Sequence, residues 1–366
     1  IKRDREMKIN FQKRLLALAI AAVMTLSLAA CGQKNGPAAS SGSQGAAAGS
    51  AEVQSGGQEG IVAFTDQAGR QVELEGPAQT VVSCYYVTTY AAIALGVADR
   101  VVGLEKKADT RPIYHMAASA LLEKPQVGTM KELDVEAVAA LAPDLVVMPK
   151  KLMDYADTLE ELGLPVMVVE PETHEGLVTM LELLGQACGV EDRAAQLTNY
   201  YEEQLDRMAQ LTEGTERPLV YLAGNSSYLT AAPDAMYQSS LIEGAGGTNV
   251  AAGLEGDYWA KVSYESVLAM APEVVIIPAG AEYTAEDILG DPQLASLPAV
   301  QSGAVYAMPS GIEEWDSPIP SGILGTMWLT SVLHEDVYPF ADFVADAQDF
   351  YQTFYGFQLD GSLITK

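Results

Sequence analysis

The sequence predicts an α/β fold of two lobes, each with a mostly parallel sheet, joined by a single long helix. Three observations support this prediction: short β-branched runs alternate with helical patterns, one helix–strand unit occurs twice, and a long charged helical pattern separates the copies. Strands that are apolar along their whole length are typical of parallel sheets with helices on both faces. The chain has 366 residues, 49% of them apolar, which is enough for two cores at about 150 residues per domain.

The individual elements follow from the periodicity of the apolar residues. Short β-branched runs are predicted as strands at residues 80–83, 101–103, 145–148, 166–169, 219–222, 274–277 and 305–308. Helical patterns are predicted between them at residues 89–95, 135–141, 155–162 and 175–187. This alternation of strands and helices is that of an α/β protein.

An internal repeat predicts that the two lobes are alike. The segment VEAVAALAPDLVVMP at 135–149 aligns without gaps on YESVLAMAPEVVIIP at 264–278. Each copy is a helix, a Pro that ends it and a buried strand. Asp134 and Ser263 precede the copies as N-cap candidates.

The two copies are separated by a long helical pattern at residues 191–211. Its apolar residues fall along one side, at Leu197, Tyr200, Tyr201, Leu205 and Met208. We therefore predict an N-terminal α/β lobe at 61–188, a connecting helix at 189–213 and a C-terminal α/β lobe at 214–366.

The N-terminal segment has the pattern of a secretory signal peptide, predicted over residues 1–30. A basic stretch after Met7 precedes an apolar run at 15–28 and then small residues, and the run is short for a membrane span. Residues 1–6 are expected to be an upstream extension. The sequence LAACG ends at Cys31-Gly32 and resembles the lipobox of bacterial lipoproteins, in which the cysteine is lipidated. The alternative is an ordinary signal peptide followed by a chance cysteine.

The stretch after Cys31 is predicted to be a flexible tether over residues 31–60, because it is rich in Gly, Ala, Ser and Gln and cannot form a core. The lipobox and tether together predict attachment to a membrane, at the outer face of the cell membrane or in the periplasm. Cys84 and Cys188 remain, either as a disulfide of an exported protein or as two separate buried residues.

The charge of the chain excludes nucleic-acid binding. The formal net charge is −28, and residues 1–30 hold six of the 21 basic and two of the 49 acidic residues, which leaves 15 basic against 47 acidic. So acidic a surface repels phosphate backbones.

Several segments, in this order and spacing, resemble the substrate-binding proteins of ABC importers, specifically the class with one helical hinge that binds iron–siderophore complexes, haem or cobalamin. The resemblance covers residues 61–356 or so. It is carried by TDQAGR at 65–70, ALGVADRVVG at 94–103, PDLVV at 143–147, AGGTN at 245–249, the second helix–strand unit and the late strand within 294–309.

The resemblance implies a monomeric substrate-binding lipoprotein that captures an iron complex of the ferric siderophore type and delivers it to ABC permease and ATPase subunits. A corrinoid, haem, molybdate or tungstate is the alternative ligand. No catalytic residue, cofactor or resident metal is expected, since His115, His174 and His334 are scattered. A lipid-anchored α/β hydrolase is disfavoured because GNSSY at 224–228 lacks the closing Gly of a nucleophile elbow. A structural or adhesive surface lipoprotein would need neither the repeated units nor aromatic loops.

In this class an exposed Glu on each lobe docks into the permease. The resemblance carries this role to Glu136 and Glu265, which are equivalent within the repeat. A Glu in a first helical turn is also favoured by the helix dipole alone.

The ligand is expected between the lobes, because ligands of open α/β sheets bind beyond the carboxyl ends of the strands. The loops there are rich in aromatic residues, which bury large flat ligands well, and Arg111 could bind a carboxylate or oxyanion with two hydrogen bonds. The predicted ligand-binding residues are Tyr85, Tyr86, Arg111, Tyr258, Trp259 and Trp315.

Overall fold

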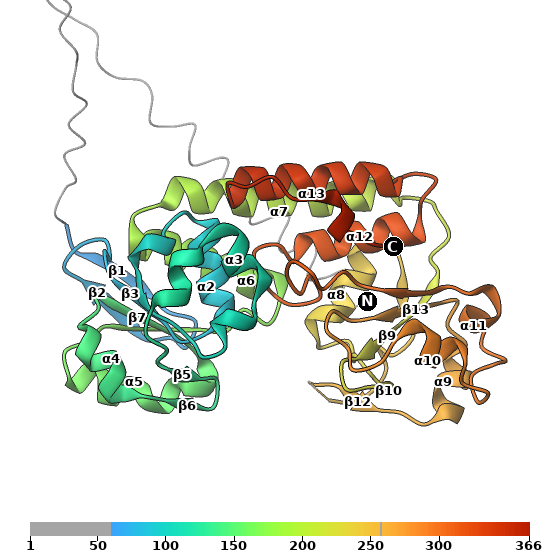
Figure 1. Cartoon of the computed structure of the whole chain (residues 1–366), viewed down its shortest axis with the longest axis horizontal. Helices are drawn as coiled ribbons and strands as arrows, with labels where there is room; N and C mark the ends of the chain where they lie inside the picture. The colour runs from blue at the N-terminus through green and yellow to red at the C-terminus, as the bar shows by residue number, and fades with distance from the viewer. Residues whose placement is uncertain (1–59, 257) are drawn as a thin grey trace, which may run out of the picture. The chain divides into compact units, whose positions relative to one another are not determined.

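The computed structural model describes residues 60–256 and 258–366, and residues 58–366 form one compact unit (Figure 1). The predicted signal peptide, Cys31 and the tether up to residue 59 lie outside the described residues. Within the described ranges, no helix combines the length and the apolar character needed to cross a membrane.

The first lobe is built on a parallel sheet, as predicted. Its strand order is β4-β3-β7-β8, with β3 in the interior between β4 and β7. The strands are β3 (Val81–Ser83), β4 (Val101–Gly103), β7 (Leu145–Pro149) and β8 (Val166–Val169). The main helices are α2 (Tyr86–Ala94), α3 (Pro112–Ala117), α4 (Val135–Leu141), α5 (Ala156–Glu161) and α6 (His174–Cys188). Two small antiparallel pairs, β1–β2 (Val62–Thr65, Gln71–Leu74) and β5–β6 (Gly128–Thr129, Glu132–Leu133), complete the lobe.

The second lobe has a mixed sheet of order β12-β10-β9-β13-β14, with β11 also paired to β9. The strands β9, β11, β13 and β14 are parallel, whereas β10 and β12 add an antiparallel edge. Their bounds are β9 (Leu219–Gly224), β10 (Ser227–Ala231), β11 (Thr248–Asn249), β12 (Ala260–Lys261), β13 (Val274–Ile277) and β14 (Val305–Ala307). The helices are α8 (Tyr237–Gly244), α9 (Tyr264–Met270), α10 (Ala285–Leu289), α11 (Pro298–Ser302), α12 (Ile323–Leu333) and α13 (Phe340–Phe354).

Alternation along the buried strands covers both faces of each sheet. In the first lobe Val81, Leu145 and Val147 belong to one apolar cluster, and their neighbours Val82 and Val146 belong to another. The second lobe repeats this division along β9. Each central strand is therefore buried on both sides, which explains why it is apolar along its whole length.

The two copies of the repeat are α4–β7 and α9–β13, and their predicted N-caps are confirmed. Asp134 Oδ1 accepts a hydrogen bond from the Ala137 N–H at 3.0 Å, and Ser263 Oγ accepts one from the Ser266 N–H at 3.2 Å. Both helices also end on an alanine in the left-handed region, Ala142 and Ala271.

The repeat includes a carboxylate that ties each unit to the neighbouring strand of its sheet. Asp144 Oδ2 accepts hydrogen bonds from the N–H groups of Gln79 and Thr80, just before β3. The equivalent Glu273 accepts from the N–H of Leu219, the first residue of β9. The corresponding strands β3 and β9 thus begin at the same relative position in both lobes.

The lobes are joined by α7 (Glu191–Leu211), at the predicted bounds, and α13 lies along it (Figure 1). Tyr200 of α7 packs against Phe350 and Phe354 of α13. Residues 340–354, predicted as part of the C-terminal lobe, therefore form a second helix at the junction. Cys84 and Cys188 are buried and unpaired.

Arg193 connects three elements at this junction. Its guanidinium donates to the carbonyl of Ala94, at the end of α2, and to the carbonyls of Thr353 and Phe354, at the end of α13. The side chain thus ties the first lobe to both helices of the junction.

We expect Arg193→Ala to lower the free energy of unfolding by about 2–3 kcal/mol, since hydrogen bonds to a charged group contribute about 1.5–3 kcal/mol each and this one is partly exposed. Urea unfolding followed by circular dichroism measures the change. Glu202→Ala, at an exposed position on α7, is the control and should have almost no effect. Equal stability of the two variants would contradict the role of Arg193.

Candidate ligand-binding cleft

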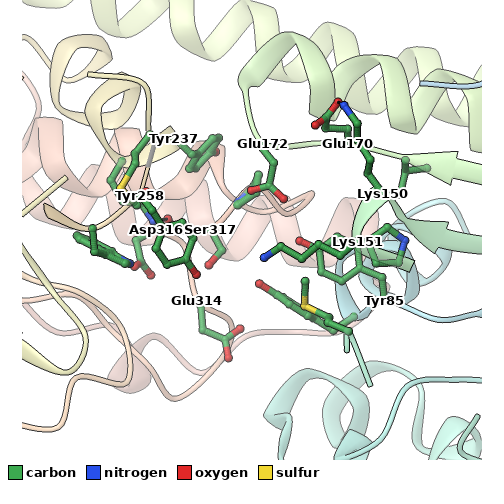
Figure 2. Close-up of a pocket in the computed structure, with 18 of the residues that line it drawn as sticks. Tyr85, Lys150, Lys151, Glu170, Glu172, Tyr237, Tyr258, Glu314, Asp316 and Ser317 are labelled. Carbon is green, nitrogen blue, oxygen red and sulfur yellow. Dashed lines mark hydrogen bonds and ion pairs between the residues drawn. The ribbon is translucent and has the colours of Figure 1, made fainter. Parts of the chain in front are cut away.

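A cavity of about 660 Å³ is lined by residues of both lobes (Figure 2). Its walls come from loops at the carboxyl ends of strands, the position expected for ligands of α/β sheets. The first lobe contributes loops after β3, β7 and β8, and the second contributes loops after β9, β13 and β14. These lining residues include Tyr85, Tyr86, Lys150, Lys151, Glu170, Glu172, Asn225, Ala279, Glu314, Asp316 and Ser317.

Aromatic side chains form much of the wall. Tyr85 and Tyr86 from the first lobe meet edge to face, with ring centroids 5.1 Å apart. Tyr258 and Trp259 from the second lobe also line the cavity, and Tyr258 is 68% exposed. The structure thus brings together four of the six residues predicted to bind a ligand.

The charges in the cavity are mixed and mainly acidic. Lys150 Nζ is paired with Glu170 at 2.7 Å, and Lys151 Nζ lies 5.8 Å from the ring centroid of Tyr258, which belongs to the opposite lobe. The other carboxyl groups on the wall are Glu172, Glu314 and Asp316. Burial raises the pKa of Glu172, and it raises the pKa of Asp316 to about 7. Asp316 is therefore partly protonated near neutral pH.

Arg111 lies behind the aromatic wall and does not line the cavity directly. Its guanidinium carbon is 4.0 Å from the centroid of the Tyr86 ring, and its Nη1 donates to the hydroxyl of Tyr90 at 3.2 Å. Two carboxylates flank it, Glu105 at 3.6 Å and Glu314 at 3.5 Å. Glu314 comes from the second lobe, so this contact bridges the two lobes beside the cavity.

The family model described as periplasmic binding protein matches residues 81–311, well over half of the chain. The chain belongs to this family. The family consists of binding proteins, so the α/β hydrolase alternative is excluded. The predicted resemblance and two-lobed fold are confirmed, and the chain is the substrate-binding protein of an ABC importer that works outside the cytoplasm with a permease and an ATPase.

Curated relatives and solved structures are also substrate-binding proteins. The molybdate-binding protein MolA of Haemophilus influenzae is 24% identical, over 80% of this chain and 90% of its own. The vitamin B12-binding protein of Vibrio campbellii is 26% identical, over 55% of this chain and 70% of the relative. The crystal structure of a solute-binding protein from Veillonella parvula has a TM-score of 0.74 at 25% identity, covering 83% of this chain and 95% of the other.

Trp315 lies in the core of this binding protein and not in the cavity, contrary to the prediction of a ligand contact. The side chain is fully buried, its Nε1 donates to the hydroxyl of Tyr351 at 2.9 Å, and its ring packs on Phe343. A large aromatic residue in an irregular segment can anchor that segment as well as bind a ligand. Here the anchoring role is the one that the contacts show.

The sequence analysis did not predict the acidic side chains on the cavity wall. Glu170 and Glu172 follow β8, while Glu314 and Asp316 flank Trp315 after β14. Their position after predicted strands could have indicated that they lie near the ligand site. In so acidic a protein, however, a single Glu or Asp cannot be distinguished from the many acidic residues of the surface. Tyr237, at the start of α8, lines the cavity but is not among the predicted ligand-binding residues. Its hydroxyl lies 3.3 Å from that of Tyr201 on α7.

Glu136 and Glu265 are exposed and lie in the first turns of α4 and α9. In Figure 1 these two helices lie on the side of the described unit away from α7 and α13. No group of three or more His, Cys, Asp or Glu residues suited to a metal ion occurs within residues 60–256 and 258–366.

The pH dependence of stability should reflect Glu313, whose pKa is raised by burial from 4.5 to about 7. Between these values the folded chain holds a proton that the unfolded chain has released, so stability falls as pH rises through this window. Glu313→Gln stays uncharged and should reduce this slope, while the raised pKa of Asp316 preserves part of it. Urea unfolding at several pH values measures the slope.

The control for this measurement is Glu182→Gln, at an exposed position on α6, which should keep the slope of the unchanged protein. A slope equally steep in Glu313→Gln would contradict the assignment.

Proposed function

We propose that this binding protein captures a metal complex of an organic ligand, of the ferric siderophore class, and that a lipid on Cys31 holds it at the membrane. Mass spectrometry of the mature N-terminus tests the lipid. The observation that carries the ligand assignment is the size of the cavity together with its aromatic walls.

The volume of the cavity favours a large organic ligand over a small inorganic ion. Pockets of about 300–1,000 Å³ enclose molecules of the size of drugs and cofactors, and the cavity here is about 660 Å³. A free tetrahedral oxyanion would fill a small part of it and leave the aromatic walls without a partner. Large organic ligands bury well against Tyr and Trp rings, whose polar edges also form hydrogen bonds.

The charges favour a ligand with both donors and acceptors. Two lysines face four carboxyl groups on the wall, and one of the lysines, Lys150, is already paired with Glu170. A bare anion would find one unpaired Nζ, that of Lys151, among several carboxylates. The chelating groups and the polar rim of a metal complex suit such a mixed surface better.

A free oxyanion is the second candidate, because the molybdate-binding protein of Haemophilus influenzae is similar over most of both chains. The vitamin B12-binding relative of Vibrio campbellii supports a corrinoid in the same way, and a corrinoid would also suit a large aromatic cavity. These candidates differ in size and charge, so one panel of compounds separates them.

We expect a ferric siderophore to raise the melting temperature of the compact unit at residues 58–366 by several degrees. A ligand at one hundred times its dissociation constant stabilises the folded state by about 2.7 kcal/mol. The measurement is a thermal-shift panel of ferric siderophores, haem, corrinoids, molybdate and tungstate. For the compound that binds, Tyr86→Ala and Trp259→Ala should weaken affinity.

Iron-free siderophores are the matched control for this panel, since they carry the same organic groups without the metal complex. Stabilisation by molybdate or a corrinoid alone would replace the iron-complex assignment. If no compound of the panel stabilises the folded protein, the iron-complex assignment is also contradicted.

We also propose that Glu136 and Glu265 dock onto the two permease subunits. Their equivalent positions in the repeat, their exposure and the absence of a salt bridge to either within the described ranges support this role. Two carboxylates placed alike on two similar lobes suit a partner that is itself made of two similar halves.

The double variant Glu136→Arg, Glu265→Arg should abolish uptake of the ligand found by the panel while its dissociation constant stays unchanged. Charge reversal places like charges opposite any basic pocket of the permease. Uptake into cells and calorimetric titration measure the two quantities. The double variant Glu182→Arg, Glu202→Arg has the same charge change at exposed positions on α6 and α7 and should transport normally. Normal uptake by the first variant would rule out the docking role.

A further inference from the structure

Arg111 has hydrogen-bond donors that the described residues do not use. A guanidinium carries five N–H donors, and the side chain of Arg111 makes one hydrogen bond within residues 60–256 and 258–366, to the hydroxyl of Tyr90. Its Nε is buried and has no hydrogen-bond partner there. The group also stacks on Tyr86, whose ring lines the cavity. Arg111 is therefore a cation directly behind the wall with unused donors.

The two carboxylates that flank Arg111 differ in how firmly they are held. Glu105 is 6% exposed in its side chain, and its two oxygens accept hydrogen bonds from Thr89 at 2.8 Å and Tyr114 at 2.7 Å. Glu314 is 37% exposed in its side chain and lines the cavity. Glu314 Oε2 accepts one hydrogen bond from the first lobe, from the hydroxyl of Tyr90 at 3.2 Å, and that contact is only partly buried. Glu314 can therefore leave Arg111 by giving up one partly buried hydrogen bond, whereas Glu105 would give up two buried ones.

The backbone that carries Glu314 is fixed by its neighbours. Glu313 accepts hydrogen bonds from the hydroxyls of Tyr351 and Tyr355, and Trp315 donates to Tyr351. A rotation of the Glu314 side chain would break its contacts with Arg111 and Tyr90 without a movement of the loop backbone.

We propose that Glu314 occupies the position on Arg111 that an anionic group of the ligand needs, and that it thereby selects multidentate anionic ligands over small anions. This inference rests on the proposed function, because it assigns one end of the same cavity to an anionic group of the metal complex. The ligand class is a complex whose organic part carries a carboxylate or another oxyanion.

The selection follows from what each ligand gains in the exchange. A small anion that displaces Glu314 has to replace both its ion pair with Arg111 and its hydrogen bond from Tyr90, and so gains little. A larger ligand makes the same exchange and also gains contacts with Tyr86 and Trp259 across the cavity. Because a partly exposed ion pair is weak, the additional contacts need to offset only a small loss.

The test is the affinity of the protein for two small anions, molybdate and citrate, measured by calorimetric titration at constant low salt. Glu314→Gln should bind at least one of them about fivefold more tightly or better, since the anion no longer competes with a carboxylate. Glu172→Gln is the matched control, because it removes the same charge from the cavity wall at a residue that is not paired with Arg111. Its effect should be clearly smaller.

A second measurement tests whether the gain in small-anion affinity depends on Arg111. In an Arg111→Gln background, Glu314→Gln should give no gain in affinity. If the Arg111→Gln protein does not fold, Arg111→Lys replaces it and should reduce the gain, since Lys lacks the planar guanidinium fork. The proposal is overturned if Glu314→Gln shows no gain or no measurable binding, if Glu172→Gln gains as much, or if the gain persists without Arg111. If Glu314→Gln binds small anions more tightly but no ferric siderophore stabilises the protein, the role of Glu314 is retained and the iron-complex assignment is removed.

Discussion

The cavity depends on a buried carboxyl group, Glu313, which fixes the loop after β14. A buried carboxyl is costly unless its oxygens are hydrogen-bonded, and here Tyr351 and Tyr355 of α13 donate to both of them. The adjacent Trp315 is fixed to the same helix. With both neighbours held from behind, Glu314 projects between them to the edge of the cavity. The helix α13 thus positions the carboxyl group that the loop after β14 places beside Arg111.

The same helix limits how the lobes can move. Bending α7 breaks hydrogen bonds of its backbone ladder, so a single connecting helix already permits only a small closure. Because α13 packs along α7, and Arg193 ties the end of α13 to the first lobe, a large rotation would also separate these contacts. We therefore expect the cavity to be largely preformed. A preformed site loses little free energy to ordering when it binds, which benefits affinity without any additional contact.

The sequence predicted what depends on local pattern. The strands β4, β8 and β13 and the helices α4 and α7 lie at their predicted bounds, because buried strands and amphipathic helices have apolar periodicities that a single segment reveals. The repeat predicted two similar lobes for the same reason. Tyr85, Tyr86, Tyr258 and Trp259 were chosen by one further rule, that ligands of open α/β sheets bind beyond the carboxyl ends of the strands, and all four line the cavity.

What the sequence could not predict depends on pairs of residues far apart in the chain. Trp315 is a core residue because Tyr351 and Phe343 of α13 surround it, and nothing in its own segment distinguishes an anchor from a ligand contact. Arg111 was predicted to bind the ligand from its charge alone, whereas its position behind Tyr86 and beside Glu314 joins residues of both lobes. Local patterns therefore place the loops around the cavity. The long-range contacts of α13 then decide which side chains in the loop after β14 are free to meet a ligand.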